Sequence, residues 1–178
     1  MKKVLIVVDM QKDFIDGSLG TKEAVQIVDN VAREIKKDYD FVICTRDTHY
    51  DDYMNTNEGR HLPVVHCIEG SEGWKLNPAI EEALSSRDQG SYMIINKPTF
   101  GSEKLVEVLK EADKKEPIES ITLVGLCTDI CVVSNALMVK AAFFETPVKV
   151  IPDCCAGVTP ETHEAALQTM KMCQIDME

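Results

Sequence analysis

The chain has 178 residues, of which 44 % are hydrophobic and 28 % are charged, a length and mixture typical of one globular domain spanning residues 1–178. Its 19 Lys and Arg against 30 Asp and Glu give a formal net charge of -11, so nucleic acid and anionic membrane surfaces would repel it. No apolar run approaches the ~20 residues of a membrane-spanning helix, and Asp9 interrupts the apolar N-terminal run before it could form a secretory signal. We therefore expect a cytoplasmic protein with no nucleic-acid partner and no membrane partner.

Short apolar runs ending in polar residues alternate along the chain with stretches of helical spacing. The runs predict buried strands at residues 4–8, 41–44, 92–95, 121–124 and 148–151, with a sixth short strand near 173–175. Helical spacing covers residues 22–37, 103–114, 129–143 and 160–172. This alternation predicts an α/β fold of three layers, in which helices cover both faces of a parallel sheet.

The segment from Thr45 to about Pro78 interrupts this rhythm, because it shows little helical or strand periodicity. Loops longer than ~12–15 residues in a compact domain usually carry function or are disordered. This one contains three of the four histidines, His49, His61 and His66. We therefore expect a functional segment.

Ligands of open parallel sheets bind beyond the carboxyl ends of the strands. That rule selects the polar residues that follow the predicted strands, which are Asp9, Asp47 with His49, Lys97, and the turn from Gly125 to Cys131. A thiol, a carboxylate and a cation at one edge of the sheet form a plausible catalytic set.

The seven cysteines are odd in number and include no C-x-x-C pair, so we expect reduced thiols. If Thr128 caps the following helix, Cys131 is the third residue of that helix, where the backbone N–H has no helical partner and the helix dipole favours a thiolate. Cys127 precedes the helix and would contribute its backbone rather than its sulfur. Two alternatives remain: Cys131 as a buried packing residue, and a redox pair of Cys127 with Cys131.

Acyl transfer through a thiol needs a base and a fixed positive charge. Asp9 would take the proton of Cys131 and return it, and Lys97 would keep the carboxylate ionised and oriented. The alternative interpretations are a turn carboxylate for Asp9 and a solvated loop lysine for Lys97.

Asp47 and His49 are two residues apart, so in an extended segment both side chains face the same side. Glu58 and His66 follow in the same segment and would complete a mixed oxygen and nitrogen site. Such ligands suit a divalent metal ion, zinc first, with manganese or iron as alternatives. By composition His61, Asp51 and Asp52 are rival ligands, and solvated loop residues are the remaining alternative.

Five motifs in register resemble the isochorismatase-like cysteine hydrolases and, within that family, the nicotinamidases. They cover almost the whole chain and lie at Val8–Phe14, Thr45–His49, His66–Gly73, Lys97 and Gly125–Val132. The resemblance implies a Rossmann-like sheet of six strands in the order 3-2-1-4-5-6 and a cis peptide bond between Leu126 and Cys127.

The resemblance also implies the roles of individual residues. It assigns a catalytic triad to Asp9, Lys97 and Cys131, and it assigns the metal to Asp47, His49 and His66. The remaining metal ligand is a histidine in some nicotinamidases and a glutamate in others, and here Glu58 would fill that position. The backbone N–H groups of Cys127 and Cys131 would form the oxyanion hole. Phe14, Leu19 and Phe100 would line an apolar slot for the substrate.

We expect a small-molecule partner, an amide, and hydrolysis of nicotinamide to nicotinate and ammonia through a thioester on Cys131. Two alternatives stay open: a cysteine amidase that acts on an N-carbamoyl or ureido compound, and a non-catalytic member that binds a ligand or senses redox state through its thiols. Family members commonly form homo-oligomers, so the resemblance also implies a dimer or a tetramer.

Overall fold

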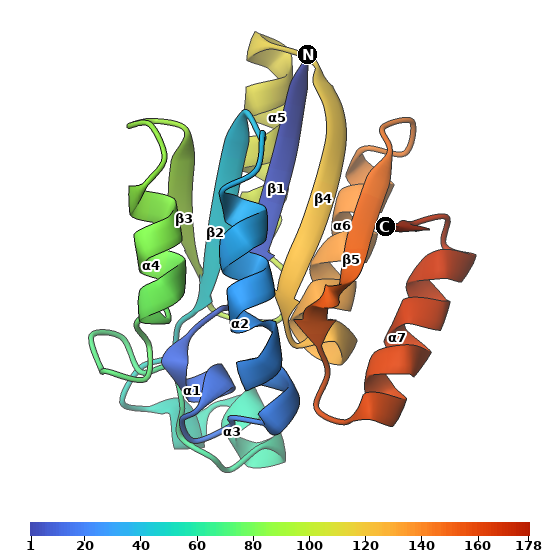
Figure 1. Cartoon of the computed structure of the whole chain (residues 1–178). Coiled ribbons are helices and arrows are strands. Elements are labelled where there is room, and N and C mark those ends of the chain that lie inside the picture. Colours follow the sequence, from blue (N-terminus) through green and yellow to red (C-terminus); the bar gives the residue numbers. More distant parts are fainter.

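The computed structural model describes residues 1–178, whose strands form one parallel sheet of six strands in the order β3-β2-β1-β4-β5-β6 (Figure 1). This result confirms the predicted fold class and strand order. The strands are β1 (Lys2–Val8), β2 (Phe41–Asp47), β3 (Tyr92–Lys97), β4 (Ile118–Leu126), β5 (Val148–Ala156) and β6 (Asp176–Met177).

The central strand β1 shows why runs of apolar residues form a sheet that is covered by helices on both faces. Side chains alternate along a strand, and Val4, Ile6 and Val8 enter one hydrophobic core while Leu5 and Val7 enter the other. All five are fully buried. A strand in this position has no solvent-facing side, so a continuous aliphatic run fits it.

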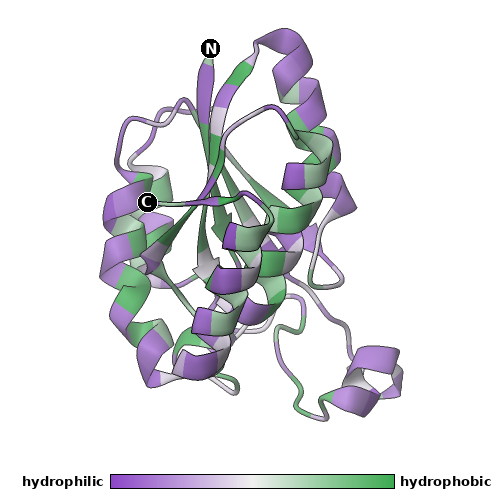
Figure 2. Cartoon of the chain, turned by 90° about the vertical axis from the view of Figure 1, so that its right-hand side faces the viewer, coloured by the Kyte–Doolittle hydropathy of each residue, from purple (hydrophilic) through white to green (hydrophobic).

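Two layers of helices cover the sheet. On one face lie α2 (Lys22–Ile35) and α4 (Pro78–Ser85), and on the other α5 (Glu103–Lys115), α6 (Val133–Ala142) and α7 (Pro160–Met172). Figure 2 shows hydrophobic residues on the strands and inward helix faces, and hydrophilic residues outside. None of these helices combines the length and apolar character needed to cross a lipid bilayer.

The segment that shows little periodicity in the sequence contains two short helical elements. A 3₁₀ turn, η1 (Tyr53–Asn55), leads into α3 (Asn57–His61), whose first turn is capped by the hydroxyl of Thr56. Both are too short for a helical period to be visible in the sequence. From residue 62 to 77 the chain forms only isolated bridges, such as His49 with Ile68.

The helix α4 was missed, although the sequence contains its start signal. Asn77 caps the helix by accepting a hydrogen bond from the N–H of Ala79, and Pro78 takes the first helical position. The sixth strand also begins later than predicted, at Asp176. Cys173 caps α7 and Gln174 adopts a positive φ of 63°, so this segment turns the chain toward the sheet edge.

All strands run in the same direction, so their carboxyl ends meet at one edge of the sheet. Two short helices, α1 (Lys12–Ile15) and α3, lie at this edge, which is the lower one in Figure 1. The residues predicted to carry the chemistry follow the strands here.

Candidate active site

Two acidic residues and a lysine reach the carboxyl edge from three neighbouring strands. Asp47 and Lys97 are the last residues of β2 and β3 and are paired in register. Asp9 directly follows β1, and its N–H donates to the carbonyl of Thr45. Its φ of 47° is a strained conformation for a residue other than glycine, a kind of strain that concentrates at functional sites.

Asp9 and Lys97 form a fully buried ion pair with 2.6 Å between Oδ2 and Nζ. The hydroxyl of Thr45 donates to the other carboxylate oxygen of Asp9 at 2.7 Å, and Lys97 Nζ donates to the carbonyl of Thr99 at 2.9 Å. Burial raises the pKa of Asp9 above its usual range even though the charge of Lys97 acts against this. Burial also opposes protonation of Lys97, but the negative charges around it, Asp9 first, hold its pKa above the ordinary value. The pair therefore offers a carboxylate of increased basicity beside a permanent cation.

Cys131 lies beside this pair on a short π-helical turn, η2 (Thr128–Val132), which leads into α6. Its Sγ atom lies 3.5 Å from Lys97 Nζ. The three residues predicted to act together, Asp9, Lys97 and Cys131, are thus brought to one place from β1, β3 and the turn after β4. Each of them is at most 5 % exposed.

The predicted capping of this turn was wrong. Cys127, not Thr128, precedes the first helical residue, and the carbonyl of Cys127 accepts the N–H groups of Ile130 and Val132. Cys131 is therefore the fourth residue of the turn rather than the third. The buried hydroxyl of Thr128 lies instead 2.8 Å from Nδ1 of His163 in α7, so a tertiary contact replaces the local cap.

The surroundings of Cys131 act against the thiolate that the helix dipole was expected to favour. Burial, followed by the charge of Asp9, raises the pKa of Cys131 well above its ordinary value, and the charge of Lys97 only partly compensates. The raised pKa favours the neutral thiol over the thiolate. A nucleophile in this position needs a base to remove its proton, and Asp9 is the nearby candidate.

The peptide bond between Leu126 and Cys127 is cis, as the resemblance implied. Just before it, Gly125 has a φ of 119°, and a Cβ atom at this position would lie 2.1 Å from the carbonyl oxygen of Val8. Only glycine allows β4 to pass this close to β1. The turn with Cys127 and Cys131 is thereby held against the strand that leads to Asp9.

Four side chains beside the triad converge as the metal prediction required. One ligand atom from each of Asp47, His49, Glu58 and His66 lies within 4.8 Å of the others. Asp47 Oδ2 is 2.9 Å from His49 Nε2 and 3.5 Å from His66 Nε2, and Glu58 Oε1 is 3.5 Å and 3.8 Å from the same two nitrogens. The contacts with the two histidines and with Lys97 hold the pKa of Asp47 below its usual range although burial acts in the opposite direction.

The surroundings of this group orient its members. His66 Nδ1 lies 2.7 Å from the carbonyl of Val64, which directs Nε2 toward the other ligand atoms. The buried ring of Tyr53 packs against both histidines, with centroid distances of 4.7 Å to His49 and 5.0 Å to His66. Two carboxylates and two imidazoles, oriented from behind in this way, suit a divalent ion such as zinc. The residues present therefore fit the expected metal.

The rival ligands lie outside this group. Asp51 and Asp52 are exposed. His61 lines the same cavity as His49 and Glu58, but its Nδ1 lies 2.8 Å from the carbonyl of Asn57 and it does not join the group of converging ligand atoms. Periodicity could not separate these candidates, because the 3₁₀ turn and α3 decide which side chains face inward.

Gln11 and Tyr53 belong to the site but were not predicted. The fully buried amide of Gln11 accepts the N–H of Asp47 at 2.7 Å and donates to the carbonyls of Asp47 and Trp74 at 2.8 Å and 2.9 Å. A polar residue two positions after the buried strand was the available signal for Gln11. Tyr53 carried no signal, because a tyrosine in an irregular segment is most simply an exposed residue.

The predicted substrate-binding residues lie in different surroundings. Phe14 packs against His66, with ring centroids 5.5 Å apart. Phe100 lines a cavity of about 750 Å³ together with His49, Glu58 and Ile130. Leu19 is partly exposed in the loop after α1 and does not line this cavity.

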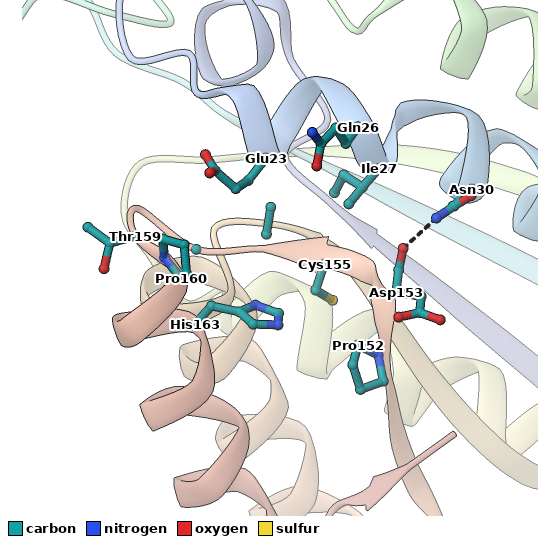
Figure 3. A pocket seen from close by; sticks show the side chains of 12 residues that line it. Glu23, Gln26, Ile27, Asn30, Pro152, Asp153, Cys155, Thr159, Pro160 and His163 are labelled. Atoms are coloured by element: carbon teal, nitrogen blue, oxygen red, sulfur yellow. Dashed lines mark hydrogen bonds between the residues drawn. The ribbon is translucent and has the colours of Figure 1, made fainter.

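A second cavity, of about 320 Å³, lies between α2 and the connection from β5 to α7 (Figure 3). Its lining includes Glu23, Asp153, Cys155 and His163, and no member of the triad or of the metal group. His163 connects its wall to the cysteine turn through the contact with Thr128. This cavity has no thiol–cation pair of the kind found beside Asp9.

Comparisons with known proteins identify the relatives of this chain. The family model described as the isochorismatase domain matches residues 3–177. The chain is 26 % identical to a nicotinamidase/pyrazinamidase of Mycobacterium tuberculosis, over 98 % of this chain and 97 % of the relative. Among solved structures, a pyrazinamidase of Pyrococcus horikoshii in complex with zinc has a TM-score of 0.80 at 25 % identity, covering 100 % and 99 % of the two chains. A nicotinamidase/pyrazinamidase of Bacillus subtilis has a TM-score of 0.83 at 26 % identity and 99 % coverage of both chains.

The fold and the buried group of side chains at its carboxyl edge define a hydrolase of the three-layer α/β class. Because the family model spans nearly the whole sequence, the chain belongs to the isochorismatase family.

Proposed function

We propose that the chain hydrolyses nicotinamide to nicotinate and ammonia through a thioester on Cys131. The observation that carries the proposal is the buried contact of Cys131 with the Asp9–Lys97 ion pair, directly beside the group of Asp47, His49, Glu58 and His66. The relatives that are named for nicotinamidase or pyrazinamidase activity support the choice of substrate.

The first half of the reaction forms the thioester. Asp9 removes the proton from the thiol of Cys131, and the sulfur attacks the amide carbon. The N–H groups of Cys127 and Cys131 hold the oxygen that becomes negative, and loss of one such donor costs ~10²–10³ in rate. Asp9 then gives its proton to the departing nitrogen, and the C–N bond breaks to release ammonia.

The second half regenerates the enzyme. Asp9 removes a proton from water, and the resulting hydroxide attacks the thioester carbon. The C–S bond then breaks to release the acid, and Asp9 returns its proton to the sulfur, which restores the thiol and the carboxylate. Lys97 stays protonated throughout and holds Asp9 in place through the contact of 2.6 Å. Its raised pKa agrees with this constant charge.

Asp47, His49, Glu58 and His66 would hold a divalent ion, zinc first. When bound, the ion supplies a Lewis acid that fixes the ring nitrogen of the substrate, directly or through water. The zinc complex of the Pyrococcus horikoshii relative supports this assignment. Phe14, which packs against His66, would bound the ring on one side.

Ammonia release from nicotinamide tests the proposal. We expect Cys131→Ala to lower turnover by at least ~10³-fold, because it removes the thiol that is hydrogen-bonded to Lys97 of the Asp9–Lys97 pair. Cys173→Ala is the matched control: it removes an exposed thiol far from the site and should turn over like the wild type. Wild-type turnover by Cys131→Ala would exclude the covalent route.

A substrate panel with and without a chelator separates the alternatives. Loss of nicotinamide cleavage on chelation supports the proposed enzyme. Metal-independent cleavage of an N-carbamoyl compound would instead indicate the related amidase, in which the metal ligands have no role in the reaction. A protein that hydrolyses neither substrate would be a binding or thiol-sensing member of the family.

A further inference from the structure

Asn135 lies one helical turn after Cys131, in α6, and is completely buried. Its Nδ2 group donates to the carbonyl of Cys131 at 2.8 Å and to the carbonyl of Phe100 at 3.0 Å. Its Oδ1 atom accepts the N–H of Ser102 at 2.9 Å. Both amide hydrogens and the amide oxygen are therefore used, and all three partners are backbone groups.

These partners belong to two segments that share no strand pairing. Lys97 ends β3 at the sheet edge, and the loop with Phe100 and Ser102 follows it, whereas Cys131 follows β4. In the sheet, β2 and β1 separate β3 from β4. The ladder of backbone hydrogen bonds therefore does not by itself fix the distance of 3.5 Å between Lys97 Nζ and Cys131 Sγ.

The side chain of Asn135 spans this junction. It ties the backbone of Cys131 to the loop that begins at Lys97, and the same loop accepts a hydrogen bond from Lys97 Nζ at the carbonyl of Thr99. The loop also packs tightly against α6, because a Cβ atom on Gly101 would lie 2.5 Å from Met138 Sδ. Small displacements of the loop would therefore change the position of the cation relative to the thiol.

We propose that Asn135 is a positioning residue. By joining the two segments, it holds the ammonium group of Lys97 at hydrogen-bonding distance from the thiol of Cys131. Only the kinetic test of this inference rests on the proposed function. Without the amide, buried carbonyl and N–H groups lose their partners and the two segments separate. A displacement of ~1 Å in such a centre costs about 10²-fold in rate.

The first test is kinetic and uses Asn135→Asp in the full-length, metal-loaded protein. Aspartate keeps the size of the side chain and an acceptor for the N–H of Ser102, but it cannot donate to both carbonyls, because an ionised carboxylate donates no hydrogen and a protonated one donates only one. We expect kcat for nicotinamide to fall by about 10²-fold while KM changes by less than about threefold, because the groups that bind the ring are unchanged. Asn135→Leu removes all three hydrogen bonds at similar volume and should lower kcat at least as much.

Ser134→Ala is the matched control. The hydroxyl of Ser134 donates to the carbonyl of Ile130 in the same turn, and it makes no hydrogen bond to the loop after β3. If Asn135 acts only through the stability of this turn, Ser134→Ala and Asn135→Asp should lower kcat in proportion to their loss of Tm. Wild-type kcat in a folded Asn135→Asp protein, or an equal loss in the control at equal Tm, would refute the positioning role.

The second test does not depend on activity. In crystal structures of the wild type and of Asn135→Asp, we expect the loop from 98 to 102 to move and Lys97 Nζ to leave hydrogen-bonding distance of Cys131 Sγ. An unchanged distance of 3.5 Å in the variant would overturn the proposal. If the wild type hydrolyses no amide, the proposed function fails, and this structural comparison alone decides the role of Asn135.

Discussion

Gly125 lies where β4 passes closest to β1, and two independent constraints act on this one residue. Its φ of 119° disfavours any side chain, and a Cβ atom would meet the carbonyl oxygen of Val8 at 2.1 Å. We expect Gly125→Ala to lower the free energy of unfolding by more than about 1 kcal/mol. Urea unfolding monitored by circular dichroism measures the loss.

Gly70 provides the control for this prediction. It also has a positive φ, of 79°, but a Cβ atom there would have nothing within 4 Å. Gly70→Ala therefore shows only the conformational strain, and its loss should be the smaller of the two. Equal losses would mean that the close approach of β4 to β1 has no energetic consequence.

The protonation of Cys131 gives a second prediction at the residue scale. Alkylation requires the thiolate, and the raised pKa of Cys131 leaves only a small thiolate fraction at neutral pH. Each unit of pH below the pKa changes that fraction by about tenfold, so the rate of alkylation by iodoacetamide should still rise between pH 7 and pH 9. Mass spectrometry of the Cys131 peptide measures the rate, with exposed Cys173 as the internal reference. A rate that is flat from pH 7 upward would show a thiolate at neutral pH instead.

At the scale of elements, the metal group depends on a contact between the start of α1 and the end of β2. Gln11 precedes α1 and binds the backbone of Asp47 on both its N–H and its carbonyl side. Residues that orient metal ligands from behind typically change metal affinity by 10–100-fold when replaced. We therefore expect Gln11→Leu to weaken zinc binding by about this factor.

Competition with a zinc-binding dye measures the affinity without any assay of activity. Gln26→Leu is the control, because Gln26 is exposed on α2 and lines the other cavity. Unchanged zinc affinity in Gln11→Leu would show that Asp47 does not need this support.

At the scale of the whole molecule, the dimer or tetramer implied by the resemblance stays a prediction. The net charge of -11 makes copies of the chain repel one another, and added salt screens this repulsion. From the resemblance we expect light scattering to give a mass of two or four chains. Because salt weakens the repulsion, we expect a larger fraction of the protein to be associated at about 0.5 M salt than at low salt. A single-chain mass at every salt concentration would contradict the prediction.

Much of the fold was predictable because it depends on local periodicity. Aliphatic runs such as Val4–Val8 and the helical spacing of residues 160–172 identify elements without knowledge of their neighbours, and their alternation implies a parallel sheet. The elements that were missed are those whose length or context hides the period. The four-residue helix α1 and the five-residue helix α3 are too short, and α4 was marked only by its start at Asn77.

The residues of the site were predictable for a related reason: in a parallel sheet, a polar residue after a buried strand must emerge at the carboxyl edge. The sequence alone therefore brought Asp9, Asp47 and Lys97 to that edge. The positions of Asp47, His49, Glu58 and His66 in one segment suggested the metal ligands, and the family resemblance supported Glu58 as one of them. The structure groups the same four side chains.

Tertiary structure decided what local patterns do not contain. The protonation of Cys131 depends on burial beside Asp9, and the partner of Thr128 is His163, which lies 35 residues away in α7. The distance between Lys97 and Cys131 depends on how the loop after β3 packs against the turn after β4, because these two strands are not hydrogen-bonded to each other. Sequence spacing determines which side of its own element a side chain faces, but only the packing of separate elements determines which atoms meet and how much water remains around them.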